Sequence, residues 1–290
     1  MIKDSIEYLI KIATNPPYSN NLLAARQEYQ KYAGDIYDDD KSYENQMALF
    51  LEWYIFDRID PAHDQTVLQL IINDGKGATL NQLKNINVFI SHIHGLFIIN
   101  KIKDHSVKVI NLFDNEKYDV IEPSGKLYFS KNSIFEGRLL SYENSHYFTG
   151  NFCFHPEGSK KFIKSEIKKI SSVQKINSKE LKLQNIKLND ENKKINKTIS
   201  RIEKLQEKNK KLDSEKKILK IKNDLSELEF IKKKHEKNYS LLKQNINKFT
   251  HETIIRESQS IQLRLMLKLS SMRLLLERSR NIDLKDIYKN

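Results

Sequence analysis

Glycine and proline are absent from the last 132 residues of this chain. All eight glycines and all five prolines lie within residues 1–158, and none occurs from Ser159 to Asn290. Aromatic residues become rare in the same segment. Because glycine and proline mark turns and aromatic side chains fill compact cores, this division predicts a globule over residues 1–156 and a long helical tail over residues 157–290.

The globule itself divides into a helical part and a β-rich part, so the predicted fold class is α+β. Residues 1–76 have the spacing of amphipathic helices; Tyr43, Met47, Phe50 and Tyr54, for example, share one helical face. Residues 77–156 contain five or six short segments rich in β-branched and aromatic residues, including "GKLYFS", separated by turn residues. They predict a small antiparallel barrel or a strongly curved sheet.

The stretch from Asp38 to Asp60 contains several carboxylates and the single tryptophan, Trp53. A calcium loop requires a glycine at its sixth position and a glutamate at its twelfth, but counting from Asp35 those positions hold Asp40 and Gln46. We therefore expect Asp38–Asp40 to cap the following helix. Trp53 is compatible with a stacking platform for a partner, but we expect it in the core.

The tail contains interrupted heptads, which predict a coiled coil or helical bundle. The first and second runs are out of phase near Lys217–Ile221, which favours a break or hairpin there. The predicted seam consists of Leu181, Leu188, Ile195, Ile202, Leu228, Leu242, Ile246 and Phe249.

The end of the tail has apolar residues on two opposite sides of a helix. A helix with two such stripes normally packs between two neighbours, so we expect self-association or partner docking here. The two stripes consist of Ile261, Leu265, Leu269, Met272 and Leu276, and of Leu263, Leu267 and Leu274.

The chain shows no strong sign of a catalytic or metal site. His92 and His94 would share a strand face, but two histidines without a nearby third ligand are more typical of a polar strand surface. Cys153 lies between two phenylalanines, as expected for a buried packing residue. Phosphate-binding, dinucleotide-binding and nucleophile-elbow motifs are missing. We expect no catalytic residue, no metal and no cofactor.

The net charge of +12 is unevenly distributed. Residues 157–290 contain 35 Lys/Arg and 18 Asp/Glu, a net charge of +17, whereas residues 1–156 carry −5. A basic tail can contact phosphates, but a chain rich in Lys, Asn and Ile can also reflect A/T-rich codons. The lysines that would contact phosphate are Lys193, Lys194, Lys210, Lys211, Lys232, Lys233 and Lys234.

Residues of about 22–155 resemble an uncharacterised bacterial protein family. The resemblance depends on an Ala-Arg-x-Glu-aromatic helix, a glycine, an acidic turn and a Phe-Leu-Glu-Trp-Tyr helix that ends in Asp-Arg, followed by a β-rich segment. It implies no activity. The matching residues are Ala25, Arg26, Glu28, Tyr29, Gly34, Asp39, Asp40, Glu44, Phe50, Leu51, Glu52, Trp53, Tyr54, Asp57 and Arg58.

These features together predict a non-enzymatic interaction protein whose basic tail associates with itself or docks a protein partner. The acidic globule is the second interaction module. One cysteine and the lack of a long apolar segment lead us to expect a cytoplasmic protein without a membrane span. The alternative is sequence-independent nucleic-acid binding through the tail, and a third interpretation is an enzyme with its site in the β-rich part.

Overall fold

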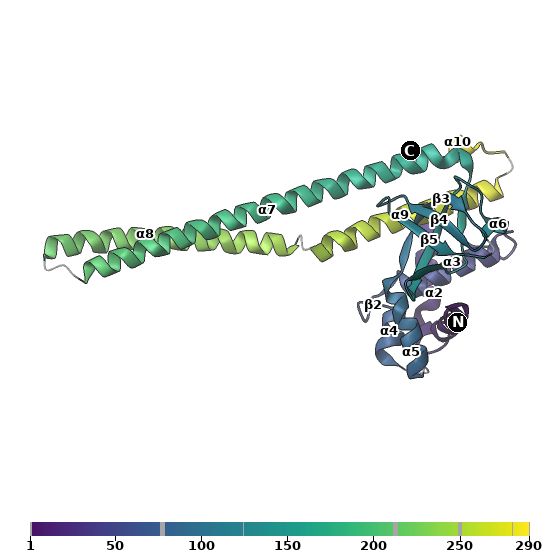
Figure 1. The fold of residues 1–290 in the computed structure, drawn as a ribbon, viewed down its shortest axis with the longest axis horizontal. Coiled ribbons are helices and arrows are strands. Elements are labelled where there is room, and N and C mark those ends of the chain that lie inside the picture. Colours follow the sequence, from purple (N-terminus) through teal and green to yellow (C-terminus); the bar gives the residue numbers. More distant parts are fainter. Residues whose placement is uncertain are drawn as a thin grey trace. The chain divides into compact units, whose positions relative to one another are not determined.

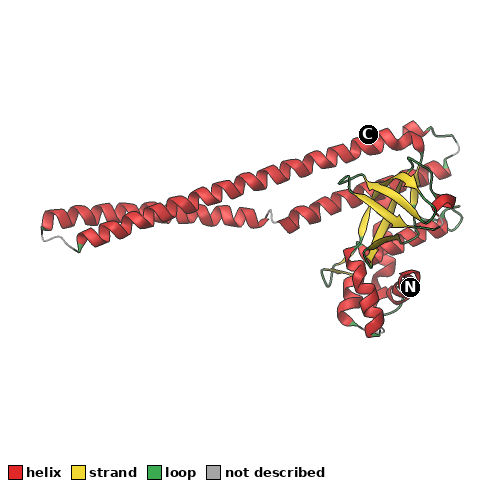
Figure 2. Cartoon of the chain, viewed as in Figure 1, coloured by secondary structure: helices red, strands yellow, loops and turns green. Residues whose placement is uncertain are grey.

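The computed structural model describes residues 2–75, 79–123, 125–210, 214–248, 251–279 and 281–289. The chain forms two compact units (Figure 1). Unit 1 contains Met1–Lys169 and Ile261–Asn290, and unit 2 contains Ile170–Ser260. Helices and a strand-rich region are both present, so the α+β prediction is confirmed (Figure 2).

Unit 1 begins with helices that enclose an aromatic core. Phe50 and Trp53 pack against Tyr29, with ring centroids 5.5 and 5.3 Å away. Trp53 is buried in this cluster, which confirms its prediction as a core residue. The elements are α1 (Ile2–Ala13), η1 (Tyr18–Asn21), α2 (Leu22–Ala33), α3 (Tyr43–Phe56), β1 (Ile59–Asp60), β2 (Gln65–Thr66), α4 (Val67–Asp74), α5 (Leu80–Asn87) and η2 (Val88–Ser91).

The acidic residues before α3 do not cap it as predicted. The N-cap position is Ser42, whose side chain makes no capping hydrogen bond. Asp40 instead accepts a hydrogen bond from the backbone N–H of Tyr37 at 3.0 Å and another from Arg278 Nε at 2.8 Å. Asp40 therefore pairs with a distant arginine, Arg278, instead of capping α3 as the sequence suggested.

The β-rich part of unit 1 is a closed five-stranded barrel with one additional strand. Its sheet order is β3-β4-β5-β7-β6, and β3 also pairs with β6, which closes the barrel. The predicted small barrel is confirmed, although β5 and β7 pair in parallel rather than antiparallel orientation. The strands are β3 (Ile93–Ile102), β4 (Ser106–Asn111), β5 (Lys117–Ile121), β6 (Ile134–Tyr142), β7 (Ser145–Phe148) and β8 (Cys153–His155), with β8 paired to β6.

One predicted strand is a short helix. "GKLYFS" forms α6 (Gly125–Tyr128) between β5 and β6. Phe129 follows it and enters the barrel core, where its ring centroid lies 5.2 Å from that of Phe135 and 5.5 Å from that of Phe148. The β propensity of this stretch is overridden because a helical turn places Phe129 inside the barrel.

Long helices follow the barrel, as the absence of glycine and proline predicts. They are α7 (Lys160–Asn209), α8 (Glu215–Lys248) and α9 (His251–Arg278), with the short η3 (Glu157–Ser159) before them and α10 (Leu284–Ile287) after them. Within unit 2, α8 runs back along α7 (Figure 1). The reversal between Asn209 and Glu215 lies a few residues before the break predicted at Lys217–Ile221.

Among the described residues, part of the predicted seam is buried in unit 2. Ile195 and Ile202 of α7 and Ile221 of α8 are buried. His235 Nδ1 lies 2.7 Å from Glu191 Oε2 across the helix pair. Five other predicted seam residues, Leu181, Leu188, Leu228, Leu242 and Ile246, are partly buried, and Phe249 lies outside the described residues.

Shortening the seam side chains is expected to weaken the helix pair. Ile195→Ala and Ile202→Ala should each lower the free energy of unfolding of unit 2 by about 2 kcal/mol, since each removes buried methyl groups. The measurement is urea unfolding followed by far-ultraviolet circular dichroism. Ile186→Ala is the matched control on the same helix, because Ile186 is 58% exposed whereas Ile195 and Ile202 are 9% and 8% exposed. Equal effects at all three positions would contradict the assigned seam.

The apolar stripes of α9 pack inside unit 1. Leu265, Leu267, Leu269 and Leu274 are buried, and Leu263 and Leu267 contact the aromatic core of the N-terminal helices. The compact units therefore differ from the predicted division at residue 157, because residues 261–290 belong with the globule. Packing within unit 1 accounts for the buried residues of the two stripes, whereas Ile261, Met272 and Leu276 are only partly buried.

Candidate functional site

A buried polar cluster lies where strand β6 meets helix α3 in unit 1. Phe135 and Leu139 of β6 belong to the barrel core, so the alternating residues Glu136 and Arg138 project from the outer face of the barrel. There they meet Glu52 and Asp57 near the end of α3. We call Glu52, Asp57, His94, Glu136, Arg138 and Asn151 the Arg138 cluster.

Arg138 is the centre of this cluster. Its guanidinium binds both carboxylate oxygens of Asp57, through Nη1 at 3.2 Å and through Nη2, and its Nε lies 3.4 Å from Glu52 Oε2. Asn151 donates to the other oxygen of Glu52 at 2.8 Å. The Arg138 guanidinium also lies 4.6 Å from the centre of the Phe56 ring. A buried charge with this many partners holds α3 against the barrel in one orientation.

His94 contacts two carboxylates of the cluster, those of Asp57 and Glu136. Its Nδ1 lies 3.2 Å from Asp57 Oδ2, and its Nε2 lies 3.0 Å from Glu136 Oε1. Burial and the Arg138 guanidinium lower the pKa of His94, but the carboxylates of Asp57 and Glu136 outweigh them and raise it to about 9. Burial raises the pKa of Asp57, but Arg138 and His94 outweigh it and hold that pKa well below its usual range.

His92 and His94 both face Asp57. His92 precedes β3, with Nδ1 3.0 Å from the carbonyl oxygen of Phe89 and Nε2 3.8 Å from Asp57 Oδ1. His94 therefore lies on a polar face of β3, as predicted, but His92 lies before the strand, so the prediction that the two histidines share a strand face is wrong.

A second group of polar side chains lies on the other side of Glu136. The ligand atoms of Glu136, Cys153 and His155 all lie within 4.8 Å of one another, and all three residues are buried. Neither ring nitrogen of His155 nor Oε2 of Glu136 has a hydrogen-bond partner among the described residues. The same is true of the buried Ser270 Oγ and Tyr288 Oη. We call Glu136, Cys153 and His155 the Cys153 triad.

The Cys153 triad does not suit nucleophilic catalysis. Burial raises the pKa of the Cys153 thiol, and burial lowers the pKa of His155 to about 4. A nucleophilic cysteine instead needs a lowered pKa and access to substrate. Cys153 is buried, as the sequence predicted, but its polar neighbours were not predicted.

Residues 21–200 match a family of unknown function (DUF7986). The chain belongs to this family. No curated protein and no solved structure matches the chain. The residues of the Arg138 cluster and the Cys153 triad all fall inside the DUF7986 match, whereas Ser270 and Tyr288 fall outside it. The family assignment agrees with the predicted resemblance to an uncharacterised family. The description of the family names no activity.

The DUF7986 match ends inside α7, so the whole of α8 and α9 lies beyond it. Residues 170–260, which form unit 2, contain 23 Lys/Arg and 13 Asp/Glu, a net charge of +10. Of the predicted phosphate contacts, Lys193 pairs weakly with Asp190 at 4.0 Å, and Lys194 pairs with Glu191 at 2.7 Å. Lys210, Lys233 and Lys234 are exposed, Lys232 is partly buried, and Lys211 lies outside the described residues.

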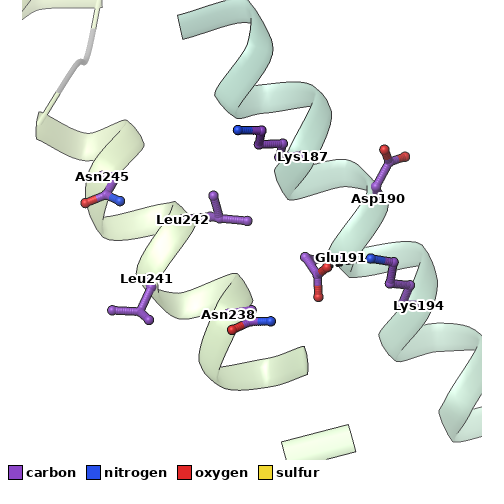
Figure 3. Close-up of a pocket in the computed structure, with 8 residues that line it drawn as sticks. All are labelled: Lys187, Asp190, Glu191, Lys194, Asn238, Leu241, Leu242 and Asn245. Carbon is purple, nitrogen blue, oxygen red and sulfur yellow. Dashed lines mark hydrogen bonds and ion pairs between the residues drawn. The ribbon is translucent and has the colours of Figure 1, made fainter. Parts of the chain in front are cut away.

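A shallow groove lies between α7 and α8 of unit 2 (Figure 3). Glu191 on its floor is paired with both Lys194 and His235 at 2.7 Å. Apart from the partly buried Glu191, its polar groups are exposed helix side chains, and they offer neither a nucleophile–base pair nor a built ligand site. The groove is lined by Lys187, Asp190, Glu191, Lys194, Asn238, Leu241, Leu242 and Asn245.

Among the helices that the structure describes, none combines the length and apolarity needed to span a bilayer.

Proposed function

We propose that this chain is a non-enzymatic interaction protein that associates with a second copy of itself through unit 2. In this proposal α7 and α8 form a coiled coil whose seam is closed within the chain, and the outer surface of α8 contacts the partner copy. Unit 1 is the second interaction module of this proposal. The sequence suggested self-association through the two stripes of α9, whereas this proposal places the contact surface on α8.

The observation that supports this proposal is a line of exposed apolar side chains on α8. Leu219, Phe230 and Leu241 are 64%, 71% and 50% exposed. They recur every 11 residues, a spacing that returns to nearly the same side of a helix after three turns. Scattered exposed apolar residues need no explanation, but three large ones aligned on one side of a highly charged helix favour a contact surface.

The charge of unit 2 gives this association a distinctive dependence on salt. Two copies of unit 2, each with a net charge of +10, repel one another, and added salt screens that repulsion. Apolar contacts are not weakened by screening. We therefore expect the dimer fraction of full-length protein at tens of micromolar to increase between about 50 and 200 mM salt in sedimentation velocity experiments.

The triple variant Leu219→Ser, Phe230→Ser and Leu241→Ser should be monomeric under the same conditions. The matched control is Lys216→Ser, Glu227→Ser and Asn238→Ser, which has the same spacing on α8, lies at exposed positions and leaves the net charge unchanged. The control should dimerise like the wild type. A wild-type protein that is monomeric at every salt concentration would overturn the proposal.

Sequence-independent nucleic-acid binding is the second candidate, because two observations favour it. Unit 2 is strongly basic, and the barrel of unit 1 has the strand connectivity of an OB fold, with a short helix between its third and fourth strands. The face that such barrels use, here β4 and β5, has exposed Lys108, but Asp119 lies 3.8 Å from it, and Tyr118 packs toward the barrel core. The lysines of unit 2 are therefore the stronger support.

Fluorescence anisotropy with labelled DNA and RNA distinguishes the two candidates. Phosphate contacts release counterions, so nucleic-acid binding should weaken steeply as salt increases from about 50 to 200 mM, whereas self-association should strengthen. Binding at low salt that disappears at high salt, in a protein that stays monomeric, would favour the second candidate.

A further inference from the structure

We propose that the Cys153 triad is a binding site for one divalent transition-metal ion, with Zn²⁺ the ion that best fits its donor atoms. The site consists of Glu136 on β6 and of Cys153 and His155 on β8. It is separate from the contact surface of the proposed function, and neither proposal depends on the other.

Strand pairing brings the three side chains together. β6 and β8 pair antiparallel with Glu136 opposite Cys153 and Ile134 opposite His155. Cys153 and His155 are two residues apart on β8, so they project from the same face of the sheet. Glu136 projects from that face as well, because directly opposed residues of an antiparallel pair point to the same side. The convergence therefore follows from backbone register.

The buried polar atoms of the triad that have no protein partner are available to bind a ligand. Both nitrogens of His155 and Oε2 of Glu136 lack partners among the described residues, although these residues and Cys153 are only 6%, 5% and 3% exposed. Buried polar atoms in folded proteins nearly always have a hydrogen-bond partner. One metal ion would satisfy an imidazole nitrogen, a carboxylate oxygen and the thiolate together.

The donor set and charge favour zinc. Thiolate sulfur, imidazole nitrogen and carboxylate oxygen are the ligands that Zn²⁺ binds in tetrahedral sites, whereas Ca²⁺ and Mg²⁺ prefer oxygen alone. Donor atoms around a tetrahedral Zn²⁺ are roughly 3.5 Å apart, and the atoms of the triad lie within 4.8 Å of one another. One thiolate and one carboxylate neutralise a divalent ion, which suits a buried site.

The Arg138 cluster supports the metal site from behind. His94 Nε2 contacts Glu136 Oε1 at 3.0 Å, and the other nitrogen of His94 faces Asp57, which Arg138 holds in turn. This series of side-chain contacts fixes the direction of the Glu136 carboxylate and leaves its Oε2 free to bind the ion. Partners of this kind commonly orient metal ligands. Water would take the fourth position of a tetrahedral site, and Ser270 and Tyr288 have buried hydroxyls near Cys153.

The test uses full-length, tag-free protein expressed in minimal medium supplied with Zn²⁺ or with Co²⁺, because buried ligands favour loading during folding. The zinc protein should contain one ion per chain by elemental analysis. The cobalt protein should show a thiolate-to-cobalt charge-transfer band in the near ultraviolet. Since Cys153 is the only cysteine, that band can come from no other residue.

Two variants test whether the metal ion binds at the Cys153 triad. His155→Gln should lower the affinity for Zn²⁺ by at least about 100-fold, whereas His105→Gln, at an exposed histidine, should leave it unchanged. The wild-type cobalt spectrum does not depend on whether His155→Gln folds. Metal-free protein from both media, or bound cobalt without the thiolate band, would overturn the proposal.

Discussion

Replacing Arg138 with methionine is expected to lower the free energy of unfolding of unit 1 by about 3–5 kcal/mol. The substitution leaves Asp57 and Glu52 buried without the guanidinium that binds them. Uncompensated buried charge is costlier than the loss of one hydrogen bond, and methionine roughly preserves the volume of the side chain. Urea unfolding followed by the fluorescence of Trp53, the single tryptophan, reports on unit 1 directly.

The matched control is Arg278→Met. Arg278 also binds an aspartate, Asp40, with Nε 2.8 Å from Oδ1, but its side chain is 30% exposed. Solvent reaches the Arg278 guanidinium, although the Asp40 carboxylate is only 7% exposed, so we expect a smaller cost than for Arg138→Met, about 1–2 kcal/mol. Adding Asp57→Asn to Arg138→Met should recover part of the lost stability, because it removes the stranded charge. Equal effects of the two arginine substitutions would contradict the assigned role of Arg138.

The cost of Arg138→Met should also depend on pH. The pKa of Asp57 is held well below its usual range in the folded state. A carboxyl with a depressed folded-state pKa contributes its stability above the unfolded pKa of about 3.9 and loses it as the pH falls through the folded value. The difference between wild type and Arg138→Met should therefore be largest near neutral pH and shrink as the pH falls below about 4.

Local patterns in the sequence predicted most of the strands and a small barrel or curved sheet, but not which strands pair to close it. β3 closes the barrel by pairing with β6, and Gly95 lies opposite Gly137 in that pairing. A Cβ atom on Gly95 would lie 3.1 Å from Oδ1 of Asn111 on the neighbouring strand β4, so a larger residue there would require that side chain to shift. The residues that meet are about forty positions apart, and no short-range signal specifies such a register.

Both buried polar groups were missed for the same reason. The spacing Cys153-x-His155 is a local signal for two ligands on one strand face, and it was available in the sequence. Glu136 joins them only through the pairing of β6 with β8. Likewise, Arg138 meets Asp57 across 81 residues of sequence. The two flanking phenylalanines identified Cys153 as buried, but only the fold shows which polar atoms share its environment.

The composition of the tail predicted helices but not where they pack. The absence of glycine and proline indicates helix from Ser159 onward, and α7, α8 and α9 confirm it. Helical periodicity alone cannot distinguish a stripe that contacts another chain from one that contacts the chain's own globule. The chain leaves unit 1 after Lys169 and returns at Ile261, so a division by composition at residue 157 separates α9 from the core that it completes.

Leu269→Ala is therefore expected to destabilise the globule rather than an oligomer. Leu269 is 0% exposed, and it lies in α9 between the buried residues Leu265 and Leu274. Removing its side-chain carbons inside a packed core should lower the free energy of unfolding of unit 1 by about 3–5 kcal/mol. Trp53 is distant from α9 in sequence but belongs to unit 1, so its fluorescence in urea should report the loss.

Leu275→Ala is the control on the same helix, because Leu275 is 48% exposed and should change the stability by about 0.5 kcal/mol or less. Sedimentation velocity separates the two interpretations of the α9 stripes. If α9 completes unit 1, Leu269→Ala shifts the Trp53 transition while the natively folded fraction keeps the association state of the wild type. If Leu269→Ala instead leaves the Trp53 transition in place and changes only the association state, α9 is an interface between chains, and the boundary of the globule returns to residue 157.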